Sequence, residues 1–276
     1  MNALDHDDVE RFITDGYVCL RGAFPSEIAR QCVHELSAAA NVDLDAPDTW
    51  HAPVVRLLGS AAAPLVAAIN SPRLVAALDE LLHPGRWQRR TGYGSFAIRF
   101  PSEHDPGDTG WHVDGSYEVG DRPPPWNYHL NFWSRGRALL LLMLFSDVGP
   151  HDAPTRIRVG SHLDVTGLLR VYGPVGAPFD EISSACAEVR MHPVVQATGD
   201  AGDVYLCHPF LLHAATWPHR GTAPRFLGQP AIHHAPAHDG FDYDRPDPSA
   251  PEIAVSRAIE RERHAAMAAS RTSEQQ

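Results

Sequence analysis

The segment Gly110-Trp111-His112-Val113-Asp114-Gly115-Ser116-Tyr117 places an imidazole and a carboxylate two residues apart. On an extended strand residues i and i+2 point to the same face, so His112 and Asp114 can reach one point. A later segment, from Gly202 to His213, adds histidines after a strand-like run, and Arg225 follows it. Two histidines and one carboxylate on one face of Fe(II), with the other positions open, form the centre of oxygen-activating non-haem iron enzymes. The ordered set predicts such a centre. For His112 and Asp114 alone the alternative is a hydrogen-bonded pair at a strand edge.

Two histidines of the later segment compete for the third ligand position. His208 closes one predicted strand just before a proline, whereas His213 ends an apolar run. Spacing alone does not choose between them, but Arg225 lies far enough beyond His213 for a hairpin to return beside it. A buried guanidinium there would need a carboxylate partner, and its planar fork suits one. Arg220 is nearer but lies in a predicted turn, so we expect it to be exposed.

The composition excludes several classes of protein. The chain has 276 residues, a hydrophobic fraction of 43% and a net charge of −11, and none of its 23 basic residues is lysine. Schiff-base enzymes, pyridoxal-phosphate enzymes and Walker-type phosphate loops each need a lysine. The acidic balance argues against a nucleic-acid binder, which needs a basic surface to neutralise phosphates. A small-molecule partner is therefore expected.

The cysteines and the apolar runs bear on the compartment. Cys19, Cys32, Cys186 and Cys207 are scattered, which predicts buried free thiols of a reducing compartment rather than a disulfide framework. The N-terminus is acidic and has no apolar signal region. No run approaches the roughly 18 apolar residues of a membrane span. We expect a cytoplasmic protein with no membrane partner. The oligomeric state is not indicated.

Hydrophobic periodicity predicts helices in the first part of the chain and strands in the second. We expect helices at 5–15, 25–40, near 60–70, at 72–82, near 180–187 and at 252–268, with a loop at 41–56. We expect strands at 17–20, 91–100, 138–146, from 156 into a turn at 162, and at 203–207, 211–215 and 225–234. This order predicts one domain, 1–276, in which a β-sandwich or barrel packs against N-terminal helices. Its parts would be a helical scaffold (1–90), a β core with the active site (91–235) and a C-terminal extension (236–276).

Taken together, the motifs resemble the phytanoyl-CoA dioxygenase family of Fe(II)/2-oxoglutarate-dependent oxygenases. The matching stretches follow in the family's order over roughly residues 8–235: Phe12 to Val18 with Leu20 to Phe24, His112-Val113-Asp114, Ser146-Asp147-Val148 with Gly160-Ser161-His162, and Gly202 to Arg225. The resemblance implies an α+β, mainly β fold. Its core would be a double-stranded β-helix (jelly-roll, cupin-like), flanked by the N-terminal helices and a C-terminal helix.

The same resemblance implies the ligand set. His112, Asp114 and His213 would hold Fe(II), with His213 rather than His208 as the distal ligand. 2-Oxoglutarate would chelate the metal with its far carboxylate on Arg225, and O₂ would be the second cosubstrate. Because Asp114 is present, the resemblance is not to the halogenase variant, which needs that position empty for chloride.

Two further residues are expected beside the cosubstrate. The family often has a small hydroxyl two residues after the distal histidine. Here that position is Ala215, and Thr216 is adjacent. The strand at 95–100 should supply another side chain, for which Arg99 is the candidate, although its register cannot be read and an exposed arginine is the alternative. The proline of the family's Pro-Gly-Ser-His is Val159 in this chain.

The implied activity is oxidation of a C–H bond in a small molecule, with hydroxylation as the expected outcome and secondary metabolism as the expected setting. Trp111, Tyr117 and Trp126, together with the proline run within 121–128, are candidate substrate contacts, and core packing is the alternative for the aromatic residues. A zinc-dependent hydrolase could use the same three ligands with a bound water. A cupin-like binding protein without catalysis is the third interpretation.

Overall fold

The strand predicted at residues 138–146 forms the centre of the main sheet. This strand, β6 (Leu139–Leu144), is buried along its whole length. The computed structural model, which describes residues 2–189 and 191–273, orders the antiparallel strands of the sheet as β1-β10-β6-β12-β3-β2, with β13 also paired to β6. The other strands are β1 (Tyr17–Leu20), β2 (Val54–Ser60), β3 (Tyr93–Arg99), β10 (Val204–Cys207), β12 (Arg225–Gly228) and β13 (Ala231–Ile232).

The two faces of β6 pack against different layers. Leu141 and Met143 belong to the large core under the N-terminal helices. The alternate leucines belong to another cluster, which includes Ile157 from a second, three-stranded antiparallel sheet. That sheet has the order β11-β7-β9, with β11 (His213–Ala214), β7 (Arg156–Arg158) and β9 (Val194–Gln196). Two antiparallel sheets therefore face each other across a buried apolar layer, as in a jelly roll.

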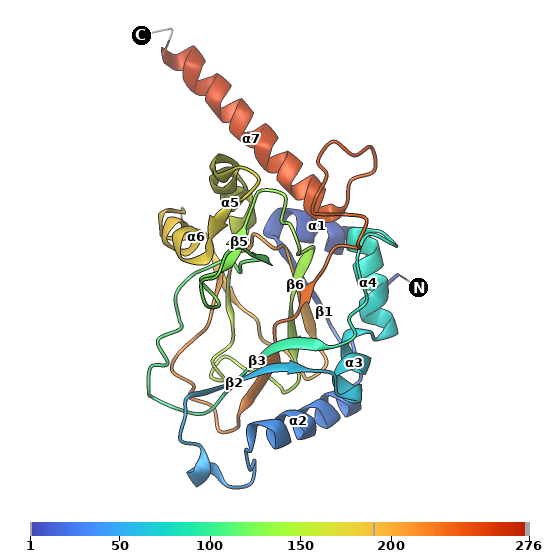
Figure 1. Ribbon diagram of the computed structural model, residues 1–276, viewed down its shortest axis with the longest axis vertical. Coiled ribbons are helices and arrows are strands. Elements are labelled where there is room, and N and C mark those ends of the chain that lie inside the picture. The colour runs from blue at the N-terminus through green and yellow to red at the C-terminus, as the bar shows by residue number, and fades with distance from the viewer. Residues whose placement is uncertain (1, 190, 274–276) are drawn as a thin grey trace.

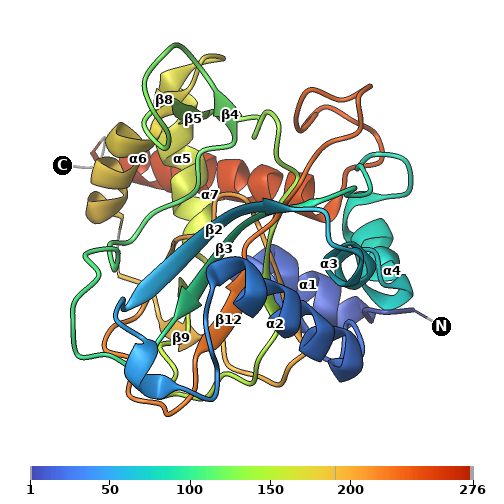
Figure 2. The ribbon, with the colours of Figure 1, turned by 60° about the horizontal axis from the view of Figure 1, so that its bottom comes forward.

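Four helices supply the N-terminal side of the large core (Figures 1 and 2). They are α1 (His6–Asp15), α2 (Ser26–Ala40), α3 (Ala63–Ile69) and α4 (Pro72–Leu82), with a short 3-10 helix at Pro47–Thr49. Asp5 and Asp8 form a capping box at the start of α1, and Ser71 caps α4. Gly16 ends α1 at φ 85°, where a Cβ would lie 2.5 Å from Nδ1 of His162, so both the backbone and the close packing require glycine.

A third small sheet and two short helices form a separate side of the molecule. The sheet has the order β4-β5-β8, and Figure 2 shows it next to α5 and α6. Its strands are β4 (Tyr117–Glu118), β5 (Tyr128–Leu130) and β8 (Ala177–Pro178), and the helices are α5 (Ser161–Leu169), α6 (Phe179–Ala185) and the 3-10 helices Arg170–Tyr172 and Cys186–Glu188. These elements share their own apolar core, which includes Leu130, Val165 and Ile182.

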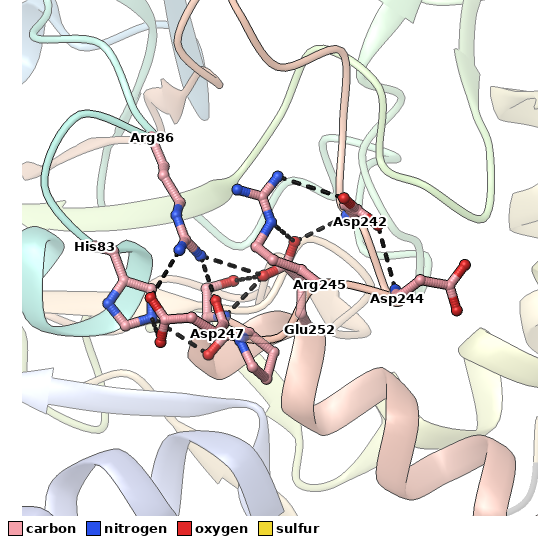
Figure 3. Close-up of polar contacts among 9 residues, drawn as sticks. His83, Arg86, Asp242, Asp244, Arg245, Asp247 and Glu252 are labelled. Carbon is pink, nitrogen blue, oxygen red and sulfur yellow. Dashed lines mark hydrogen bonds and ion pairs between the residues drawn. The ribbon is translucent and has the colours of Figure 1, made fainter.

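The C-terminal helix α7 (Ala250–Ser273) packs its first half against α1, α4 and α5, and its second half projects from the body (Figure 1). Its start is fixed by Glu252, which is 3% exposed. The Glu252 carboxylate accepts hydrogen bonds from the backbone N–H of Asp242 and from the N–H and hydroxyl of Ser249. Arg86 and Arg245 lie 3.9 Å from it (Figure 3). Among the helices of the described residues, none combines the length and the hydropathy of a membrane span.

The α+β class and the order of the elements agree with the sequence analysis, and the differences lie in the details. The small sheet β4-β5-β8 and strand β9 were not predicted. β2 occupies the end of the predicted loop at 41–56 and the beginning of the helix predicted near 60–70, so the predicted helical scaffold (1–90) supplies two strands of the main sheet, β1 and β2. α5 was not predicted. His112 and Asp114 lie outside the regular strands, and His112 forms only an isolated bridge with His213.

Candidate metal centre and adjoining arginine pocket

Two reciprocal backbone hydrogen bonds bring the distant histidines together. The N–H of His112 donates to the carbonyl of His213 at 3.1 Å, and the N–H of His213 donates to the carbonyl of His112 at 3.0 Å. His213 in turn pairs with Ile157, whose side chain lies in the apolar layer between the two sheets. Directly paired residues of antiparallel strands share a face, so the imidazole of His213 points into that interior.

The side chains of His112, Asp114 and His213 form a compact donor set. One ligand atom from each lies within 4.8 Å of the other two. Oδ1 of Asp114 is 3.7 Å from Nε2 of His112 and 3.8 Å from Nε2 of His213. Because ligand bonds to such metals are about 2 Å long, one ion between these atoms can reach them all.

The other ring nitrogens of the two histidines are already used. Nδ1 of His112 is 2.9 Å from the carbonyl oxygen of Gly110, and Nδ1 of His213 is 3.1 Å from that of Leu211. A carbonyl accepts only from N–H, so each Nε2 keeps its lone pair, as metal-binding histidines require. Nε2 of His213 is buried and has no hydrogen-bond partner among the described residues. An orphaned ring nitrogen beside a carboxylate fits a divalent metal ion.

The charges at the site favour metal binding by neutral imidazole and ionised carboxylate. Burial disfavours the ionised form of Asp114, but the charge and hydrogen bond of Arg137, together with the two histidines, outweigh this and hold its pKa well below the usual range. Burial lowers the pKa of His213 to about 4. At neutral pH both side chains are therefore already in their ligating form.

The competing histidine, His208, lies in a different environment. Its ring contacts Phe12, His162, Phe210 and Phe241, and its Nδ1 accepts from the N–H of Phe210. It is not part of the donor set. Spacing did not choose between His208 and His213. The fold places His213, and not His208, in the donor set.

A cavity of about 190 Å³ adjoins the donor set and contains two buried arginines. Arg99 on β3 and Arg225 on β12 are directly paired across the main sheet, so their side chains share the interior face. The cavity is lined by Arg56, Ala97, Arg99, Asp108, His112, Thr155, His213, Ala215, Arg225 and Gln229. It therefore joins His112 and His213 of the donor set to a pair of guanidinium groups.

The two arginines differ in their partners. Nη2 of Arg99 donates to Asp108 Oδ2 at 2.6 Å, and Arg56 donates to the same oxygen. Arg225 donates through Nη1 to the carbonyl of Ala153, its Nε is buried with no hydrogen-bond partner, and no ion pair to it is found among the described residues. Burial and the neighbouring charge of Arg99 lower the pKa of Arg225 to about 9. A buried cation without a carboxylate is a site for an anionic ligand.

Thr216 does not line this cavity. Its hydroxyl donates to the carbonyl of Pro154 at 2.5 Å, and its side chain faces a separate small cavity beside Trp217. The cavity wall carries Ala215 and, from the segment before β7, the hydroxyl of buried Thr155. Thr155 rather than Thr216 is therefore the hydroxyl residue that lines this cavity, and the role predicted for Thr216 beside the cosubstrate stays a prediction.

Of the three aromatic residues predicted to contact substrate, Trp126 is linked to the ring of His112 through one other aromatic ring. Its ring, in a side chain 42% exposed, is 6.1 Å from that of Phe179, which is 5.8 Å from the ring of His112. Tyr117, on β4 of the small sheet, donates its hydroxyl to the carbonyl of Val175 in the turn before β8. Trp111 packs on the core shared by α5 and α6, with Arg156 and Arg158 over its ring at 5.0 and 4.4 Å. None of the three aromatic residues lines the arginine cavity.

Sequence reasoning missed three residues of the site: Arg137, Asp108 and Phe179. Each lies in an irregular segment or at the beginning of a helix, where no periodicity indicates which way a side chain points. Of the three, only Arg137 could have been suspected from the sequence. An arginine just before a fully apolar strand must either extend its side chain to solvent or pair with a carboxylate.

The chain was compared with known proteins. The model of the family described as phytanoyl-CoA dioxygenase (PhyH) matches residues 12–226. No curated protein matches the sequence. EctD from S. alaskensis, solved with 2-oxoglutarate and 5-hydroxyectoine, is 20% identical with a TM-score of 0.54, over 86% of this chain and 78% of that chain.

Two other solved structures share the architecture. HygX from Streptomyces hygroscopicus, with nickel and 2-oxoglutarate bound, is 18% identical with a TM-score of 0.51, over 90% of this chain and 95% of that one. The epimerase SnoN, in complex with Fe3+, alpha ketoglutarate and nogalamycin RO, is 18% identical with a TM-score of 0.52, over 83% and 82%. These likenesses confirm the predicted jelly-roll fold.

Proposed function

The chain belongs to the phytanoyl-CoA dioxygenase family, and from that premise we propose that it is an Fe(II)- and 2-oxoglutarate-dependent oxygenase that hydroxylates a C–H bond of a small molecule. In this proposal His112, Asp114 and His213 are the metal ligands. Arg225 binds the far carboxylate of 2-oxoglutarate, and O₂ is the second cosubstrate.

One observation carries the proposal: His112 and His213 of the donor set line the same cavity as Arg225, a buried arginine with no carboxylate partner among the described residues. A metal site alone would fit many reactions. A keto-diacid needs both parts, a metal for its keto-acid end and a cation for its far end. EctD and HygX were each solved with 2-oxoglutarate, which supports the same ligand here.

The ferrous ion, when bound, supplies the redox chemistry by which O₂ oxidises 2-oxoglutarate to succinate and CO₂ and the substrate to its product. The chain supplies positioning. The backbone carbonyls of Gly110 and Leu211 hold the two imidazoles in the ligating tautomer. Arg225 fixes the far end of the diacid, and the apolar layer between the sheets keeps water away from this end of the cavity.

The substrate is proposed to approach from the side of Phe179 and Trp126, since their rings form the aromatic contacts that extend outward from His112. An aromatic wall suits a small, partly apolar molecule, and a secondary metabolite is our proposal. Once succinate release from a small-molecule library identifies a substrate, Trp126→Ala should raise its KM. Trp133→Ala, at a similarly exposed tryptophan outside this wall, should not.

The central test uses purified protein under anaerobic conditions with Fe(II) and 2-oxoglutarate. A weak visible charge-transfer band is expected on chelation. After O₂ and substrate are added, succinate should form in equal amount to the hydroxylated product. An epimerised product in place of a hydroxylated one would contradict hydroxylation and indicate an epimerase, as SnoN is described. Absence of both the band and succinate would refute the proposal as a whole.

Arg225→Ala separates an oxygenase from a zinc hydrolase. Loss of a buried charged hydrogen bond is worth about 2–3 kcal/mol, so 2-oxoglutarate affinity should fall about 100-fold while the metal stays bound. The control is Arg220→Ala, whose exposed guanidinium lies 3.6 Å from Glu103 outside the cavity. A hydrolase would lose nothing specific to Arg225, and a binding protein without catalysis would form no succinate.

For the compartment we propose the cytoplasm. The four cysteines are free, and three of them are buried, which favours a reducing environment. For the domain organisation we propose one domain over residues 1–276.

A further inference from the structure

Arg137 contacts the proposed metal ligand Asp114 on the side away from the histidines. Its Nη1 donates to Oδ2 of Asp114 at 2.8 Å, and its Nη2 donates to the carbonyl oxygen of Gly115 at 2.7 Å. The Arg137 side chain is only 12% exposed. The planar guanidinium thus holds the carboxylate and the backbone of the next residue at the same time.

The segment that carries Arg137 is itself fixed. The N–H of Arg137 donates to the carbonyl of Ser134, and the Ser134 hydroxyl donates to the carbonyl of Arg137. Gly136, at φ 79°, packs so closely on the ligand segment that a Cβ there would lie 2.7 Å from the carbonyl oxygen of Ser116. β6 follows at once and is fully buried. The guanidinium is therefore presented from a rigid turn rather than from a loose loop.

The two oxygens of Asp114 consequently have different roles. Oδ1 is the oxygen measured at 3.7 and 3.8 Å from the two Nε2 atoms, whereas Oδ2 is held by Arg137. Carboxylates bind metals through one oxygen or through both. An oxygen that accepts a charge-assisted hydrogen bond in a fixed geometry is held away from a second metal bond.

We propose that Arg137 is a positioning residue that restricts Asp114 to one-oxygen coordination and so preserves the metal positions that a keto-acid chelate needs. Two histidines and one carboxylate oxygen leave three positions on a six-coordinate ion, and a two-oxygen carboxylate would occupy one of them. This inference rests on the proposed function, because it concerns the same metal and the same diacid.

The test measures 2-oxoglutarate affinity by the anaerobic charge-transfer band in protein saturated with Fe(II), with metal occupancy assayed separately. Arg137→Gln should keep the metal but bind 2-oxoglutarate at least about 10-fold more weakly, the lower end of the effects seen for partners of metal ligands. Arg137→Lys, whose ammonium can still donate to Oδ2, should stay within about threefold of wild type. Arg86→Gln is the control, since it breaks a partly buried arginine–carboxylate pair remote from the cavity.

Equal 2-oxoglutarate affinity in wild type and Arg137→Gln would overturn the inference, as would an Arg137→Lys protein as impaired as Arg137→Gln. If Arg137→Gln does not fold, a crystal structure of the wild-type protein with Mn(II) tests the role of Arg137 instead. Asp114 should bind through Oδ1 alone with Oδ2 still on Arg137, and coordination through both oxygens would contradict this.

If wild type itself binds no Fe(II) or shows no band, the proposed function fails. If wild type is normal and Arg137→Gln is unaffected, only the role of Arg137 is refuted.

Discussion

Asp108 determines how many carboxylates the arginine cavity can accept. Its Oδ2 takes hydrogen bonds from both Arg99 and Arg56, so two of the three guanidinium groups that line the cavity already share a carboxylate partner. Only Arg225 is left for a ligand. This arrangement suits a molecule with one free carboxylate at its far end.

Asp108→Asn should therefore change stability and affinity in opposite directions. Loss of the carboxylate leaves buried Arg99 without its counter-charge and should lower the free energy of unfolding by about 2 kcal/mol, between the values for exposed and buried pairs. It also removes an anion beside Arg225, so 2-oxoglutarate should raise Tm more than in wild type.

Thermal unfolding with and without 2-oxoglutarate checks this prediction. Asp105→Asn is the control in the same loop, because the Asp105 side chain accepts only from the N–H of Gly107. A smaller ligand-induced shift in Asp108→Asn than in wild type would contradict the role given to Asp108.

His162 should make the fold sensitive to acid. It is fully buried, and burial lowers its pKa from 6.5 to about 4. The unfolded chain then binds more protons than the folded one between about pH 6.5 and 4, so stability is complete above 6.5 and falls as the pH drops through this window. One such group contributes at most about 1.4 kcal/mol per pH unit.

Urea unfolding at several values between pH 7 and 4 tests this for wild type and His162→Gln. The variant keeps a donor for the carbonyl of Ile13, which His162 now contacts at 3.0 Å. Its stability should decline less steeply with acid. If the free energy of unfolding falls equally with acid in the two proteins, another group is responsible for the loss of stability.

At the scale of elements, the start of α7 is fixed by one buried carboxylate. Glu252 holds the 242–249 segment through three hydrogen bonds and faces Arg86 and Arg245 (Figure 3). Since α7 contacts α1, α4 and α5, this carboxylate ties the C-terminal extension to both sides of the molecule.

Glu252→Gln should destabilise the protein by about 2–4 kcal/mol, because an amide cannot accept every one of these bonds and leaves two arginines uncompensated. Glu260→Gln, at an exposed position of the same helix, should change the free energy of unfolding by no more than about 0.5 kcal/mol. Chemical denaturation of the two variants makes the comparison, and equal stabilities would refute the anchoring role.

At the scale of the whole molecule, three buried apolar clusters join helices and sheets into what we propose is one domain. A single domain should unfold in one cooperative step. Far-ultraviolet circular dichroism and tryptophan fluorescence should then give coincident melting curves. Two separate transitions would contradict the proposal of a single domain.

The sequence alone was enough to predict the central strand, the N-terminal helices and the grouping of the donor set. β6 consists of six consecutive apolar residues, and Ser71 caps α4, the helix that follows it. Both are local patterns, so each element can be predicted from its own stretch of sequence. The convergence of His112 with His213 was predicted from an ordered set of motifs. It is produced by two backbone hydrogen bonds that no local pattern encodes.

What the sequence did not reveal depends on packing across the chain. α5 lacks an amphipathic pattern because most of its surface is covered, and its Gly167 allows the side chain of Glu262 on α7 to approach. β2 is an edge strand whose pairing with β3 is set by that neighbour and not by its own mixed composition. Arg137 reaches Asp114 only because a turn folds back over 115–117.

The measurement that tests the account most directly is an anaerobic crystal structure with Fe(II) and 2-oxoglutarate. We expect one metal ion bound to Nε2 of His112, Oδ1 of Asp114 and Nε2 of His213, with the far carboxylate of the diacid on Arg225. A metal ion bound elsewhere, or a diacid whose far carboxylate does not contact Arg225, would contradict it.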